Sequence, residues 1–158
     1  INRYYLKNIP EYINTNNSMI DAAINTKFVY CNENGIGTTC KILGDCKSID
    51  NFQLSIIILN LLDNAIEACE KIEVSKRWIT VNIIYKEHTL ILKICNSKEI
   101  KKANIALSSK RHYKQSGIGI HSVTRVVEKY NGTIEFWDLD DSFEVSAILY
   151  GILSEVEL

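Results

Sequence analysis

A long apolar run from Phe52 to Ile72 constrains the fold most, because it contains neither Pro nor Gly. Its length exceeds that of a strand and its polar residues argue against a membrane span, so we interpret it as a largely buried helix. Asn60 and Asn64 are four residues apart and share one face of this helix, and Glu67 follows one turn later. Asn disfavours burial without hydrogen-bond partners. The helix alone therefore leaves two alternatives, a polar ligand docked on that face or two surface amides.

Composition restricts the classes of partner. The 158 residues suffice for one domain with a substantial core, and the net charge of -1 gives no electrostatic basis for a nucleic-acid partner. No membrane contact by this domain is expected, because we interpret no apolar run as long enough to span a membrane. The cysteines are odd in number and form no C-x-x-C pair, which favours buried free thiols in a reducing cytoplasm over disulfides or a zinc site. These cysteines are Cys31, Cys40, Cys46, Cys69 and Cys95.

Periodicity and turn signals predict the remaining elements. Asn17 or Ser18 is expected to cap a helix that runs to about Asn32 and ends at Gly35. Alternating apolar residues predict strands at 36–43, 78–85, 89–95, 133–137 and 142–150, and the last four form two hairpins. Residues 1–13 are expected to be helical with an interruption near Pro10. The sum is an α+β fold, a two-layer α/β sandwich with a mixed sheet and helices on one face.

A second motif lies downstream at Ser116-Gly117-Ile118-Gly119-Ile120. The two glycines open a predicted helix, and Gly132 closes it. Backbone N–H groups at a helix start bind anions, aided by the positive end of the helix dipole. A single Gly-x-Gly is weak evidence for such a site. The asparagine helix upstream, with a hairpin between the two motifs, makes the combination more specific.

Together the two motifs resemble the GHKL ATP-binding superfamily of gyrase, heat-shock chaperones and sensor histidine kinases. Residues 60–65 resemble its N box, and residues 117–120 resemble its second glycine box. The resemblance implies a Bergerat-type ATP-binding fold that binds ATP and Mg2+. It implies that Asn64 ligates the magnesium and that Gly117, Ile118, Gly119 and Ile120 bind the nucleotide.

The resemblance also assigns Asn60 to the catalytic position, beside the nucleotide. The hydrolases of the superfamily carry a glutamate there as general base, and an amide has no useful basicity near neutral pH. This departure favours the histidine kinases, which hold ATP intact until a histidine attacks it. Glu67 is interpreted as a surface residue, with a place near the phosphates as the alternative.

The adenine site departs from the superfamily pattern as well. An Asp-x-Gly is usual there, whereas this chain has Asn96-Ser97. The side-chain oxygen of Asn96 can accept a hydrogen bond from the adenine amino group, but Asn96 could also simply end a strand. Residues 96–116 resemble the ATP lid, in which Lys110, Arg111 and Lys114 are candidates to contact the γ-phosphate, with a solvated surface as the alternative for each.

Within the histidine kinases, residues 19–27, residues 60–68 and Asn96 resemble the accessory-gene-regulator type of peptide quorum-sensing kinase. Residues 1–16 are then the remnant of the preceding dimerisation or linker helix, and residues 17–158 are the catalytic domain. The expected partners are a phosphoacceptor helix of the same or a partner kinase chain, a response regulator and a second copy in the full-length homodimer. The expected location is the cytoplasmic side of a bacterial membrane protein. The alternative is a degenerate nucleotide-binding or interaction module without kinase turnover.

Overall fold

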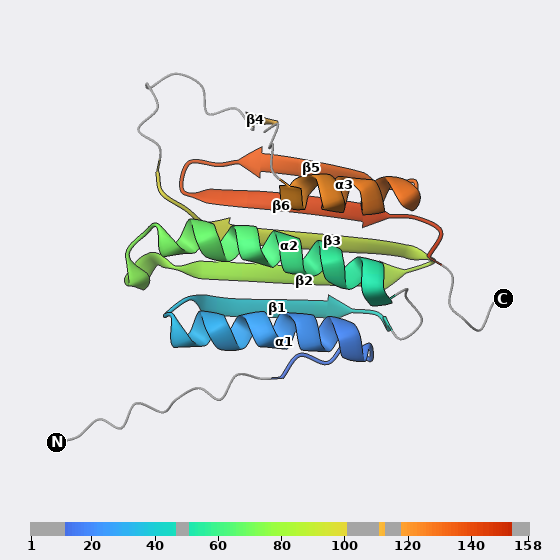
Figure 1. The fold of residues 1–158 in the computed structure, drawn as a ribbon, viewed down its shortest axis with the longest axis horizontal. Helices are drawn as coiled ribbons and strands as arrows, with labels where there is room; N and C mark the ends of the chain where they lie inside the picture. The colour runs from blue at the N-terminus through green and yellow to red at the C-terminus, as the bar shows by residue number, and fades with distance from the viewer. Residues whose placement is uncertain (1–11, 47–50, 101–110, 113–117, 153–158) are drawn as a thin grey trace.

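Three helices cover one face of a six-stranded sheet (Figure 1). The computed structural model describes residues 12–46, 51–100, 111–112 and 118–152. The helices are α1 (Ser18–Glu33), α2 (Asn51–Glu70) and α3 (Ile118–Lys129), with a 3-10 turn η1 (Val74–Lys76). The strands are β1 (Gly37–Leu43), β2 (Trp78–Lys86), β3 (Thr89–Ser97), β4 (Arg111–His112), β5 (Thr133–Asp138) and β6 (Ser142–Leu149).

The sheet is mixed, in the order β1-β2-β3-β6-β5-β4. β1 runs parallel to β2, and every other neighbouring pair is antiparallel. β2 and β3 form a hairpin through Glu87 and His88, which both have positive φ, the geometry of a tight two-residue turn. The predicted two-layer α+β sandwich with a mixed sheet and helices on one face is confirmed.

The strand register decides which residues face the helices. Ile79, Asn96, Phe143 and Asp138 form one cross-strand row over β2, β3, β6 and β5. Ile79 is 1% exposed and belongs to the core beneath α2, so the whole row lies on the helix-covered face. The register thereby brings Asn96 of β3 and Asp138 of β5 to the same face of the sheet.

α1 follows its predicted bounds. The Asn17 side chain caps it by accepting a hydrogen bond from the Ile20 N–H at 3.1 Å. At the other end Gly35 has φ +68°, and a Cβ there would lie 2.4 Å from Val74 Cγ1. Glycine is therefore required both by the backbone conformation and by the space available.

α2 is the central core helix, as predicted, although it ends at Glu70 and not at Ile72. The run was predicted to be too polar for a membrane span; this was wrong, because Phe52–Glu70 is long and apolar enough to cross a membrane by length and composition alone. Its packing explains the apolar surface, since α2 contacts α1, α3 and β3. Leu62 and Ile58, both 0% exposed, lie in the shared core.

Two local predictions differ from the structure. Residues 111–112, expected in a lid without regular structure, form the short strand β4 against β5. Tyr12 and Ile13 are not helical, and the rest of the predicted helix at 1–13 lies outside the described residues. Ile13 instead pairs with the Asn25 side chain in α1, donating its N–H to Oδ1 at 2.8 Å. The segment just before α1 therefore packs on that helix.

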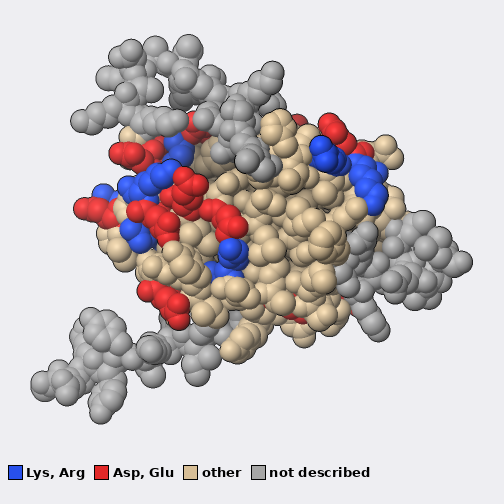
Figure 2. Space-filling model, in the orientation of Figure 1, with Lys and Arg blue, Asp and Glu red and all other residues tan. Residues whose placement is uncertain are grey.

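Charged side chains gather over the C-terminal ends of α1 and α2 on the helix-covered face (Figure 2). Both signs are interleaved there, and exposed pairs such as Lys71–Glu67 at 2.8 Å join them. The hydrogen bond and charge of Lys71 lower the pKa of Glu67. Glu67 is thus a surface residue, as interpreted from the sequence.

All five cysteines are free thiols, and Cys31, Cys46 and Cys69 are buried. Burial raises the pKa of Cys31, Cys40 and Cys46 to about 11. Because the thiolate is the nucleophile, we expect these thiols to react with an aromatic disulfide reagent at pH 8 about 100-fold more slowly in the folded protein than in guanidinium. Absorbance kinetics count the thiols in each phase. Uniform fast modification of the folded protein would contradict the burial.

Candidate functional site

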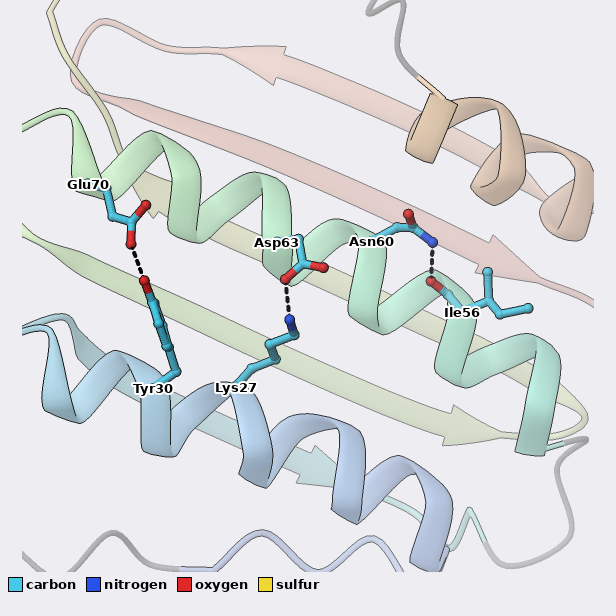
Figure 3. Close-up of polar contacts among 6 residues, drawn as sticks. All are labelled: Lys27, Tyr30, Ile56, Asn60, Asp63 and Glu70. Atoms are coloured by element: carbon cyan, nitrogen blue, oxygen red, sulfur yellow. Dashed lines mark hydrogen bonds and ion pairs between the residues drawn. The ribbon is translucent and has the colours of Figure 1, made fainter.

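The first turn of α3 lies directly against Asn60 of α2. Asn60 Nδ2 donates to the Ile56 carbonyl at 2.7 Å, one turn back along its own helix (Figure 3). A Cβ on Gly119 would lie 2.8 Å from Asn60 Oδ1, closer than real Cβ contacts allow. Gly119 is therefore the residue that permits this approach of α3 to α2.

A cavity of about 220 Å³ opens between α2, α3 and the helix-covered face of the sheet. Its lining combines apolar walls with a few polar groups, the usual composition of a small-molecule site. The described lining residues are Leu61, Asn64, Ala65, Ala68, Lys71, Asn96, Lys98, Ile120, Phe136, Asp138, Phe143 and Val145. Phe136 and Phe143 contact each other in this lining, with ring centroids 6.3 Å apart.

Asn96 enters the cavity from β3. It is 3% exposed, and its Nδ2 donates to the Ser97 carbonyl at 2.9 Å. With the amide nitrogen engaged in this way, the oxygen is the atom suited to accept a hydrogen bond from a ligand. β3 continues through Ser97, so Asn96 is an inward-facing strand residue and does not end the strand.

An ion pair that the sequence analysis missed forms another part of the wall. Lys98 Nζ lies 2.7 Å from Asp138 Oδ1, and the two side chains are only 14% and 20% exposed. In the sequence, Lys98 stood in the predicted lid and Asp138 in the predicted turn after a strand. Only the register of β3, β6 and β5 places Asp138 on the same face as Asn96.

A family model described as the GHKL domain matches residues 49–149, most of the chain and the whole of this site. The chain belongs to the GHKL domain family. The two helices beside the cavity, α2 with Asn60 and Asn64 and α3 with Gly119, carry the motifs on which the resemblance in sequence rested.

Solved structures of histidine kinases share the fold of this GHKL domain. The catalytic domain of histidine kinase ThkA superposes with a TM-score of 0.63 at 14% identity, covering 85% of this chain and 92% of that one. The mycobacterial sensor histidine kinase MprB gives 0.59 at 18% identity over 85% and 94%. Full-length ShkA in complex with AMPPNP gives 0.65 at 14% identity over 91% and 32%. No curated protein matches the chain in sequence.

The structure brings together some of the sequence-predicted residues of the GHKL domain. Asn64, Asn96 and Ile120 line one cavity. Asn60 and Gly119 contact each other beside it and are absent from the described part of its lining. Ile118 begins α3, and Arg111 belongs to β4. Lys110, Lys114 and Gly117 lie outside the described residues.

Asn96 provides a direct test of the cavity. We expect Asn96→Asp to keep or strengthen ATP binding and Asn96→Leu to weaken it by about fivefold, the value of one neutral hydrogen bond near 1 kcal/mol. Calorimetric titration with ATP measures both variants, and thermal melts monitor the fold. Undiminished ATP binding by Asn96→Leu would remove Asn96 from the ligand site.

Proposed function

We propose that this GHKL domain is the ATP-binding catalytic domain of a sensor histidine kinase, which transfers the γ-phosphoryl group of ATP to a histidine on a phosphoacceptor helix. The cavity carries this proposal, since Asn64 of α2, Asn96 of β3 and Ile120 in the first turn of α3 line it together. One polar group lies on the helix wall, another lies on the sheet, and the start of a helix stands beside them. This arrangement suits a ligand that combines a base with a phosphate chain.

The residues of the cavity fit an ATP–magnesium complex. Magnesium prefers oxygen ligands, keeps several waters and shares phosphate oxygens, so one amide oxygen from the protein suffices. Asn64 would hold the ion, whose chemistry is to neutralise charge on the phosphates. The N–H groups in the first turn of α3, which have no acceptor within the helix, would bind phosphate oxygens, and the apolar walls would exclude water from the base.

Asn60 supports transfer over hydrolysis. Its nitrogen is bonded to the Ile56 carbonyl, and its oxygen faces the position of Gly119. An amide has no useful basicity near neutral pH, so Asn60 cannot accept a proton from an attacking water. We therefore expect phosphoryl transfer to depend on positioning of the attacking histidine.

The accessory-gene-regulator type of peptide quorum-sensing kinase remains our proposal for the subtype, supported by residues 19–27, residues 60–68 and Asn96. It implies a cytoplasmic location in a bacterial membrane protein, a homodimer in the full-length protein and a response regulator as a further partner. These proposals rest on the resemblance in sequence.

Calorimetry with ATP, with and without magnesium, tests the proposed function. We expect binding that strengthens with magnesium, together with negligible phosphate release by the chain alone in a coupled colorimetric assay. Absence of ATP binding would favour the degenerate interaction module. Rapid phosphate release that Asn64→Ala abolishes would favour a hydrolytic ATPase.

A further inference from the structure

The Lys98–Asp138 pair differs from the exposed ion pairs of this domain. In Lys71–Glu67 and Lys76–Glu73 every side chain is more than 60% exposed, whereas Lys98 and Asp138 are 14% and 20% exposed. Removing two charges from water costs free energy that their attraction does not reliably recover. The location of this pair in a cavity wall therefore suggests a use other than stability.

The Asp138 carboxylate has one oxygen committed to the protein. Oδ1 is fully buried and 2.7 Å from Lys98 Nζ, but within the part of the chain that the structure describes no hydrogen bond of good geometry reaches it. Lys98 Nζ also donates to the Asp140 carbonyl at 3.4 Å. The lysine thus spans from the end of β3 to the end of β5 and holds the carboxylate in place. Because Asp138 also lines the cavity, we assign the contact with a ligand to its other oxygen, Oδ2.

The surroundings of the carboxylate suit a purine. Phe143 lies between Asn96 and Asp138 in the cross-strand row, and Phe136 contacts its ring. Two strand spacings separate Asn96 from Asp138, on the order of 10 Å between backbones. That span admits the amino group of a planar base between the two acceptors, each of which can accept one of its two N–H bonds, with an aromatic surface beside the base. A carboxylate accepts a stronger hydrogen bond from an amino group than a neutral amide does.

We propose that Asp138, positioned by Lys98, is a specificity residue of this cavity that accepts a hydrogen bond from the exocyclic amino group of an adenine base. The inference rests on the proposed ATP-binding function and deepens it. It assigns the charged acceptor of the base to the end of β5, where the sequence alone showed a turn. Position 96, which carries a neutral amide, then acts together with this carboxylate.

The test compares ATP with purine riboside triphosphate, which lacks the amino group. The variant Lys98→Met/Asp138→Ala removes the pair without stranding either charge. The matched control is Lys93→Met/Glu144→Ala, which removes a 2.9 Å pair from the same sheet. The control pair lies on the face away from the helices, because Glu144 follows inward-facing Phe143 in β6. Calorimetry gives the ratio of the two affinities for each protein.

We expect the preference for ATP over the analogue to fall about tenfold in the test variant, with analogue affinity unchanged within about twofold, and to stay constant in the control. Asp138→Asn, which preserves shape, should lower the same ratio if the double variant does not fold. Equal loss of both ligands, or an unchanged ratio, would overturn the inference while leaving ATP binding established. Failure of the unmodified chain to bind ATP would overturn the proposed function itself.

Discussion

Replacement of Asn64 by Ala is expected to lower the magnesium-dependent affinity for ATP by about 10- to 100-fold, the value of one hydrogen-bonding or ligand contact to a charged group. Asn64 lines the cavity from α2, next to Ala65 and one turn before Ala68. Ala is the better helix former, so the substitution should not lower the free energy of unfolding. Loss of binding without loss of stability would therefore mark a ligand contact.

The matched control for this prediction is Asp63→Ala, one residue earlier on α2. Asp63 is 57% exposed and faces α1, where it forms an ion pair with the 26% exposed Lys27 (Figure 3). Asp63 is not among the described lining residues of the cavity. Loss of this partly exposed pair should lower the free energy of unfolding by about 1 kcal/mol and leave ATP affinity unchanged. Calorimetry with and without magnesium, and melting curves for both variants, provide the comparison. Equal magnesium dependence in Asn64→Ala and the unmodified chain would contradict a role as metal ligand.

Local sequence patterns were sufficient for most of the fold. The Asn17 cap and Gly35 define α1 through backbone chemistry that involves only neighbouring residues. The strands around Glu87 and His88 follow from alternation and a short turn. Such signals are local, so a single sequence contains them.

Features that depend on pairing between distant segments were not predictable. β4 exists because residues 111–112 reach the edge of β5, and nothing in their own sequence marks a strand. Asp138 meets Lys98 only through the register of three strands. The contact of Asn60 with the Gly119 position likewise depends on how α3 docks on α2. Sequence identified both residues as candidates, but it did not show that they lie beside the cavity and touch each other.

The close approach of Asn60 to the Gly119 position leads to the second large expected effect, a loss of ATP affinity. We expect Gly119→Val to lower ATP affinity at least tenfold, because even the Cβ would lie 2.8 Å from Asn60 Oδ1. Either Asn60 must leave the Ile56 carbonyl or the start of α3 must move away from α2. The second response carries the N–H groups of the first turn away from the phosphates, and each hydrogen bond to a charged group is worth about 1.5–3 kcal/mol.

Two further variants separate these responses. Gly37→Ala is the matched control, since a Cβ there meets the Arg77 carbonyl at an ordinary 3.5 Å on the edge strand β1. Asn60→Ala combined with Gly119→Ala removes the obstructing amide. If the collision displaces α3, the double variant should bind ATP more tightly than Gly119→Ala alone, and a double-mutant cycle should give a coupling of about 0.5–3 kcal/mol. Additive losses, or a Gly119→Val protein that binds ATP like the unmodified chain, would show that the approach of α3 to Asn60 does not shape the phosphate site.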